Sequence, residues 1–249
     1  MSGMVMVRQP DCITLLSDGG CYRSTADFTI TGFASKPMVF PHLSMVICGI
    51  GCTTTNMLVD HCLQRDWTSF DNAVSTLRKR LREVIETVWQ LDHKRDHATN
   101  YIFIGGYSEK RSRWESYNLM LDCQYGRDPA KGIGKLNPGA EVMIFPMPDE
   151  ADLKQYGFNS PNIVFSDLRS DLVNFMRAQR ATPQTMGEIG DDDPDLPDGH
   201  TVGGFMELVT LRRHSALTEI VWRWPDKRGR MINRKHEGQA VQPAMTFTA

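Results

Sequence analysis

Three pairs of β-rich runs constrain the fold more than any other feature of the sequence. In each pair, two apolar or alternating segments are separated by a few turn-forming or charged residues, which is typical of a β-hairpin. The pairs are Met4–Arg8 with Cys12–Leu16, Thr99–Glu109 with Trp114–Cys123, and Gly203–Arg213 with Ala216–Asp226. Because hairpins join antiparallel strands, we expect a fold built on antiparallel sheet.

Two long helices are expected between these hairpins. Apolar residues recur at three- and four-residue steps over Phe70–Leu91 and again over Phe165–Ala178, which is the period of a helix with one buried face. Shorter strands are expected at Phe28–Gly32, Met45–Gly49 and Glu141–Phe145, and a further helix after Gly51. We assign an α+β fold with helices packed on antiparallel sheet, in one domain over residues 1–230 with a polar tail over residues 231–249.

Composition excludes several classes of partner. With 249 residues, 41% of them apolar, the chain can bury a sizeable core. The net charge is −2 and no segment forms a basic stripe, so a nucleic-acid partner is not expected. The N-terminus lacks the pattern of a secretory signal, and the longest apolar run, Met45–Cys52, is too short to span a bilayer. We therefore expect a cytoplasmic protein with no membrane partner.

The cysteines and histidines do not predict a metal site. No two cysteines form a CxxC pair, and the histidines show neither HxxxH nor HExxH spacing. We expect no metal and no other cofactor, and we interpret the cysteines as buried free thiols. They are Cys12, Cys21, Cys48, Cys52, Cys62 and Cys123.

An aspartate and a lysine stand out near the N-terminus. The run LLSDGGCY ends an apolar segment with Asp18, and SKPMVF places Lys36 one hairpin further on. If Met1 is removed, which the small side chain of Ser2 permits, Asp18 lies sixteen residues after a new N-terminal serine and Lys36 thirty-four residues after it. The run VICGIGCTTTNM then brings Gly51 to the end of a strand.

This spacing, together with the order of strands and helices, resembles the N-terminal nucleophile (Ntn) hydrolases of the proteasome type, such as 20S proteasome subunits. The resemblance covers about the first 125 residues. It implies a four-layer αββα sandwich of the Ntn-hydrolase, proteasome-like kind. It also implies catalytic roles for Ser2, Asp18, Lys36 and Gly51, and self-association into a ring.

The chemistry explains why these residue types belong together. A serine hydroxyl needs a base, and a free α-amine, with an ordinary pKa of about 7.7–8.0, can be that base on the same residue, Ser2. An ammonium such as that of Lys36 favours the neutral amine and the developing alkoxide, and Asp18 would hold it in place. The backbone N–H of Gly51 matches the family's oxyanion donor.

Ordinary explanations exist for each residue alone. Asp18 precedes two glycines, which is a common turn sequence, and Lys36 could be a surface lysine. Two functional hypotheses therefore stand: a peptidase or amide hydrolase that acts on a peptide or protein, and a catalytically inactive assembly subunit. Three tryptophans suggest more apolar surface than a single domain of this size needs, which favours an oligomer. They are Trp67, Trp89 and Trp114.

Overall fold

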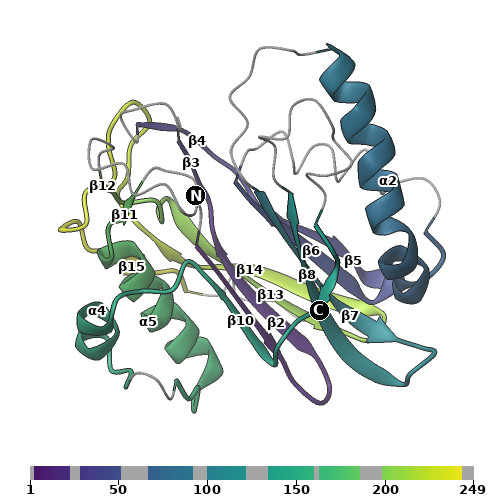
Figure 1. Cartoon of the computed structure of the whole chain (residues 1–249). Coiled ribbons are helices and arrows are strands. Elements are labelled where there is room, and N and C mark those ends of the chain that lie inside the picture. The colour runs from purple at the N-terminus through teal and green to yellow at the C-terminus, as the bar shows by residue number, and fades with distance from the viewer. Residues whose placement is uncertain are drawn as a thin grey trace, which may run out of the picture.

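The computed structural model describes residues 3–22, 29–51, 67–91, 100–121, 134–159, 163–185 and 198–242. In these residues two antiparallel sheets lie face to face, and the helices lie against their outer surfaces (Figure 1). Helix α2 covers one sheet, whereas α4 and α5 cover the other.

The first sheet has six strands in the order β10-β1-β2-β13-β14-β15. The N-terminal hairpin occupies its middle, and β13, from the C-terminal part of the chain, pairs with β2. The bounds are β1 Met4–Arg8, β2 Ile13–Asp18, β10 Val142–Phe145, β13 Phe205–Arg212, β14 Ser215–Arg223 and β15 Gln239–Ala240.

The second sheet has five strands in the order β5-β6-β7-β8-β9. Its bounds are β5 Pro37–Phe40, β6 Met45–Ile50, β7 Asn100–Ser108, β8 Arg113–Leu121 and β9 Asn137–Pro138, and a 3-10 turn, η1 Pro41–Leu43, joins β5 to β6. Two small two-stranded sheets pair β3 Gly20–Tyr22 with β4 Ile30–Phe33, and β11 Gln184–Thr185 with β12 Asp198–Gly199.

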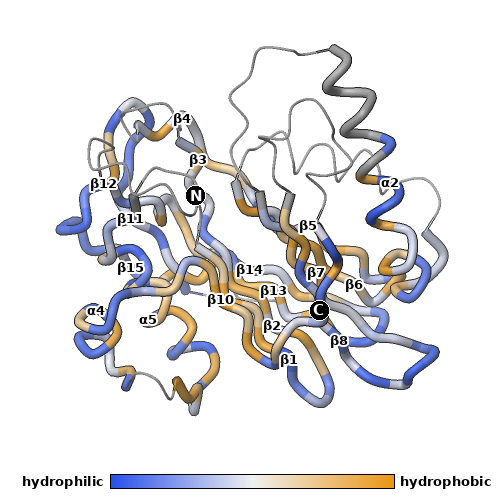
Figure 2. The backbone as a smooth tube through the Cα atoms, in the orientation of Figure 1, coloured by the Kyte–Doolittle hydropathy of each residue, from blue (hydrophilic) through white to orange (hydrophobic). Residues whose placement is uncertain are grey.

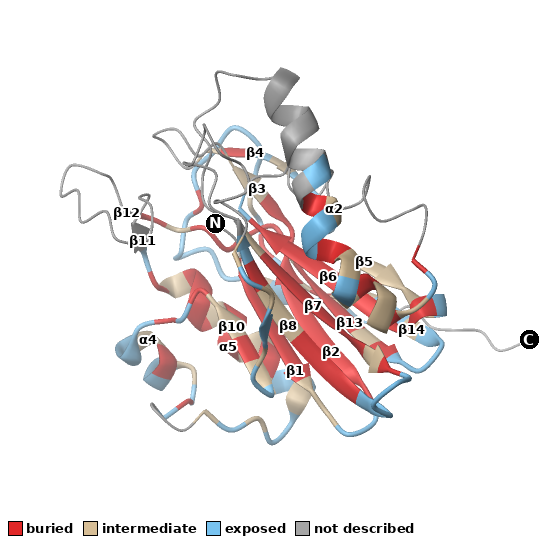
Figure 3. Ribbon diagram, turned by 45° about the vertical axis from the view of Figure 1, so that its right-hand side comes forward, coloured by how far each residue is buried: buried red, intermediate tan, exposed pale blue. Residues whose placement is uncertain are grey.

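Side chains alternate between two cores along each central strand. In β1, Met4 and Met6 pack between the sheets, whereas Val5 and Val7 pack beneath α5. Figure 3 shows the consequence as buried strands at the centre of both sheets, and Figure 2 shows that several of them are hydrophobic over much of their length. Because both faces of these antiparallel strands are covered, their sequences read as continuous apolar runs rather than as polar and apolar residues in alternation.

Three α-helices are present in the described part: α2 Phe70–Leu91, α4 Glu150–Gln155 and α5 Leu168–Ala181. Phe70 and Leu77 bring α2 onto the five-stranded sheet. Leu172 and Phe175 bring α5 onto the six-stranded sheet. Helix α4 adds Leu153 to the same cluster, after Asp149 caps its N-terminus by accepting a hydrogen bond from the backbone N–H of Asp152.

The local predictions from the sequence are largely confirmed. All three hairpins form, and the first long helix has the predicted bounds. The second helix begins at Leu168 and ends at Ala181, three residues later at each end than predicted. Phe165 packs on the same cluster from outside the helix, which explains why it fitted the helical period. The helix expected after Gly51 lies outside the described residues.

The predicted four-layer αββα sandwich of the proteasome-like Ntn-hydrolase type is wrong for this structure. The described residues are mostly antiparallel sheet with three helices, α2, α4 and α5, rather than two sheets covered by a full helical layer on each outer face. Hydrophobic periodicity identifies which segments are helical, but it does not determine how many helices cover a sheet.

Two other expectations concern surfaces. Trp67 and Trp114 are buried and belong to the cores, so the expectation that they add apolar surface was wrong. The side chain of Trp89 lies outside the described residues.

Among the helices of the described part, none is long and apolar enough to cross a membrane. The division at residue 230 stays a prediction, although β15 pairs with β14.

We expect Gly106→Ala to destabilise the fold, because Gly106 lies where α2 meets β7. A methyl group there would collide with the ring of Phe70 and would lie 2.7 Å from the backbone oxygen of Ser44. The expected loss is about 1–3 kcal/mol of unfolding free energy. Thermal and urea denaturation of Gly106→Ala, beside Gly32→Ala, would test it. A methyl group at Gly32 meets no atom within 4 Å, so that variant should change stability by less than about 0.5 kcal/mol. Equal stability of the two variants would contradict this packing.

Candidate functional site

Asp18 ends β2 with a fully buried side chain. The hairpin register that pairs Met4 with Ser17 places Gly3 beside Asp18. The backbone N–H of Asp18 donates to the oxygen of Gly3 at 3.1 Å, and the N–H of Gly3 donates to Oδ1 of Asp18 at 3.0 Å. The residue that follows Ser2 in the chain is therefore fixed directly on the Asp18 carboxylate.

Lys36 forms an ion pair with Asp18, as predicted from their spacing. Its Nζ lies 2.5 Å from Oδ1 of Asp18, and the lysine is only 7% exposed. Lys36 comes immediately before β5, where Pro37 pairs with Cys48 of β6. The register of the five-stranded sheet thus brings the ammonium group to the end of the other sheet's β2.

The second carboxylate oxygen of Asp18 is occupied as well. Oδ2 accepts the backbone N–H groups of Gly20 and Gly203, both at 3.1 Å. An ionised carboxylate has about four acceptor positions, and these contacts use four of them. Asp18 is therefore suited to be a fixed anion that orients Lys36, and it is poorly placed to accept a proton during a reaction.

The structure says less about the other two predicted site residues, Ser2 and Gly51. Ser2 lies outside the described residues, although its neighbour Gly3 is bound to Asp18. Gly51 directly follows β6, is exposed, and has a φ of 123°, which a glycine adopts without strain. It lies three residues beyond Cys48, the partner of Pro37, and so at the same end of the sheet as Lys36. The described contacts include none between Gly51 and the ion pair.

Cys48 is a neighbour of the site that cannot supply a nucleophile. Burial is the main cause that raises the pKa of its thiol to about 12, and the charges of Asp18 and Glu207 raise it further, whereas Lys36 lowers it. The thiol is therefore protonated at neutral pH, and only a thiolate attacks efficiently.

The donor set does not suit a metal. Within the described ranges, no group of three or more His, Cys, Asp or Glu residues is arranged to hold a metal ion. Asp18 is the buried carboxylate of the site, and its oxygens are already taken by N–H donors and by the ammonium of Lys36.

Sequence analysis missed the glycines that surround Asp18. The N–H groups of Gly3, Gly20 and Gly203 complete the site, and Gly203 lies 185 residues from Asp18 in the chain. The pair Gly203-Gly204 at the start of a predicted strand was the available signal. Nothing in a single sequence connects that pair to Asp18, because the contact depends on β13 pairing with β2.

No protein-family model matches this chain, and no curated protein is significantly similar to it in sequence. Solved structures do match. Anbu from Hyphomicrobium sp. strain MC1 has a TM-score of 0.52 and 8% sequence identity, over 88% of this chain and 87% of that chain. The Anbu complex from Pseudomonas aeruginosa, whose structure is that of a helical assembly, has a TM-score of 0.54 and 14% identity, over 89% and 86%.

These matches correct the resemblance drawn from the sequence. Both of these structures are Anbu proteins, and the described part of this chain does not form the proteasome-like sandwich that the resemblance implied. At 8% and 14% identity the likeness concerns the fold alone. The chain is therefore similar in fold to Anbu proteins over most of its length.

Proposed function

We propose that this protein is an amide hydrolase that uses Ser2 as its nucleophile once Met1 has been removed. The observation that supports it best is the buried ion pair between Lys36 and Asp18, which lies against Gly3. The carboxylate of Asp18 binds both the ammonium of Lys36 and the N–H of Gly3, which follows Ser2 in the chain. In the proposed mature protein, Ser2 carries the free α-amine. A cation held near such an amine activates an N-terminal hydroxyl nucleophile.

In the proposed reaction, Oγ of Ser2 attacks the carbonyl carbon of a peptide or protein amide. The α-amine of Ser2 takes the hydroxyl proton and then gives it to the leaving amine, which breaks the C–N bond and leaves an ester on Ser2. Water then hydrolyses the ester and restores the hydroxyl. The ammonium of Lys36 stabilises the negative charge that develops on Oγ, and the N–H of Gly51 is the proposed donor to the oxyanion.

The second candidate is a catalytically inactive subunit that keeps the fold for assembly. Two observations are compatible with it. The likeness to Anbu proteins concerns the fold alone, and a buried ion pair can also be a purely structural feature. The two candidates differ in one measurable property, which is the reactivity of Ser2.

We expect a free Ser2 to be acylated by a β-lactone, a reagent that esterifies activated hydroxyl nucleophiles. The protein would be released from a cleavable fusion so that the chain starts at Ser2, and intact mass with peptide mapping would locate the adduct. Protein that retains Met1 and the Ser2→Ala variant are the controls, and both should stay unmodified. If the chain that starts at Ser2 also stays unmodified, the inactive subunit is the better account.

We expect Lys36→Ala to lower the acylation rate of Ser2 by about 10²–10³-fold, because the cation beside the nucleophile is lost. The variant leaves the carboxylate of Asp18 buried without its ion-pair partner, so it should also lose about 3–5 kcal/mol of stability. Rates must therefore be measured below its unfolding temperature.

Two further variants make this experiment decisive. Lys154→Ala removes an exposed lysine of α4 and should match the wild type in rate and stability. Lys36→Arg keeps a cation beside Asp18, so it should fold better than Lys36→Ala and lose less activity. A folded Lys36→Ala variant that is acylated as fast as the wild type would refute the role of Lys36.

We also propose that the chain associates with copies of itself. The fold is similar to that of the Anbu complex from Pseudomonas aeruginosa, which forms a helical assembly. Contacts between different surfaces of identical subunits form a closed ring if their rotation returns to the start, and otherwise form an open helix.

We expect light scattering at micromolar concentration to give a mass several times that of one chain, which is 28.2 kDa. A ring should keep one mass over a range of concentrations, whereas an open helix should grow as concentration rises, and negative-stain images would separate the two. A mass of one chain at all concentrations and at low salt would refute self-association.

A further inference from the structure

A buried ion pair joins α5 to the segment that follows β14. The guanidinium of Arg180 meets both carboxylate oxygens of Asp226 at 2.8 Å. The two side chains are 3% and 1% exposed, and the guanidinium also lies over the ring of Trp224, 4.6 Å from its centre. Removing two charges from water is costly, so a pair this deeply buried needs further hydrogen bonds around it.

Two of those further bonds go to one short segment before β13, and a third runs from Nη2 of Arg180 to the backbone oxygen of Asn233 at 3.0 Å. Arg180 Nη1 donates to the backbone oxygen of Val202 at 2.8 Å, and Oδ2 of Asp226 accepts the N–H of Gly204 at 2.8 Å. The residue between these two contacts is Gly203, whose N–H donates to Asp18. The ion pair therefore fixes the backbone on both sides of a group that binds the Asp18 carboxylate.

The packing leaves this segment little freedom. A methyl group on Gly203 would lie 2.8 Å from Oδ2 of Asp226. On the other side, a methyl group on Gly3 would lie 2.8 Å from the side chain of Val202. The segment is thus held between the ion pair and Gly3, which is the residue next to Ser2.

We propose that Arg180 and Asp226 are positioning residues for the site at Asp18. They hold Val202 and Gly203 so that the N–H of Gly203 faces Asp18 and the side chain of Val202 supports Gly3. Gly3, the residue next to Ser2 in the chain, and Lys36 then keep a fixed relation through the shared carboxylate. The claim that this matters for reactivity rests on the proposed function, whereas the claim that the ion pair fixes Gly203 does not.

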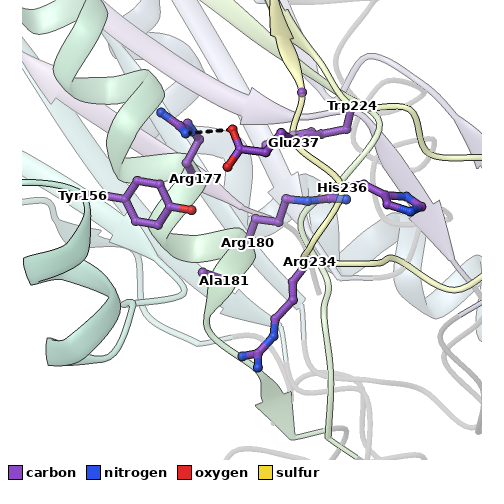
Figure 4. Close-up of a pocket in the computed structure, with 9 residues that line it drawn as sticks. Tyr156, Arg177, Arg180, Ala181, Trp224, Arg234, His236 and Glu237 are labelled. Carbon is purple, nitrogen blue, oxygen red and sulfur yellow. Dashed lines mark hydrogen bonds and ion pairs between the residues drawn. The ribbon is translucent and has the colours of Figure 1, made fainter.

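The same helix offers a matched control. Arg177 lies one turn before Arg180 and lines the same surface pocket (Figure 4). Its guanidinium stacks on Tyr156 and Trp222 and contacts Glu237 at 3.4 Å. Its described contacts do not include the segment before β13, so Arg177→Lys removes an arginine from this surface without releasing Gly203.

The experiment compares Arg180→Lys, Asp226→Asn and Arg177→Lys by amide hydrogen exchange and by the rate at which a β-lactone acylates Ser2. In Arg180→Lys and Asp226→Asn we expect the exchange rate of the Gly203 N–H to rise at least tenfold. The acylation rate of Ser2 should fall about 10–100-fold. These changes correspond to the loss of one or two hydrogen bonds to a charged group. Exchange within β2 should not change, which separates this local effect from global unfolding. Arg177→Lys should match the wild type in both measurements.

The outcomes distinguish the two claims. Unchanged exchange at Gly203 in a folded Arg180→Lys or Asp226→Asn variant overturns the inference, and so does raised exchange with unchanged acylation. A wild-type protein that is never acylated overturns the proposed function, while exchange at Gly203 still decides whether the ion pair fixes the segment. If Arg180→Lys does not fold, the nearly isosteric Asp226→Asn decides the matter alone.

Discussion

The carboxylate of Asp18 is the point at which four separate parts of the chain meet. The residue before β1, the first residue of β3, the residue before β5 and the segment before β13 each contribute one contact to it. A buried charge of this kind is tolerated only when its hydrogen-bonding positions are filled, so the four parts cannot vary independently. Both sheets contribute, because Lys36 precedes β5 whereas Asp18 ends β2.

The sheets hold these parts in place because both of their faces are covered. One apolar cluster lies between the sheets, a second lies beneath α2, and a third lies beneath α4 and α5. A slip of one residue in any central strand would exchange its two sets of side chains between two different clusters. The register that brings Pro37 of the edge strand β5 opposite Cys48, and hence Lys36 to Asp18, depends on the cluster between the sheets, to which Val39 and Cys48 contribute.

Sequence patterns predicted the features that depend on residues close together in the chain, and failed for contacts between distant residues. The three hairpins and the helix from Phe70 to Leu91 follow from patterns within about twenty residues, and they were predicted well. The ion pair of Asp18 and Lys36 was predicted from spacing, through a resemblance whose family assignment and sandwich architecture were both wrong. The contact of Gly203 with Asp18 and the insertion of β13 between β2 and β14 were not predicted, since pairing over such separations leaves no local pattern.

The position of β13 in its sheet also sets the order in which the site is completed during synthesis. Asp18 leaves the ribosome 185 residues before Gly203, which at about 5–20 residues per second is a delay of roughly 10 to 40 s. Until then β2 lacks β13 as a neighbour, and the carboxylate lacks one of its four partners. For most of its synthesis a nascent chain thus lacks the Gly203 contact, and only the N-terminal part of the chain can supply partners to the Asp18 carboxylate.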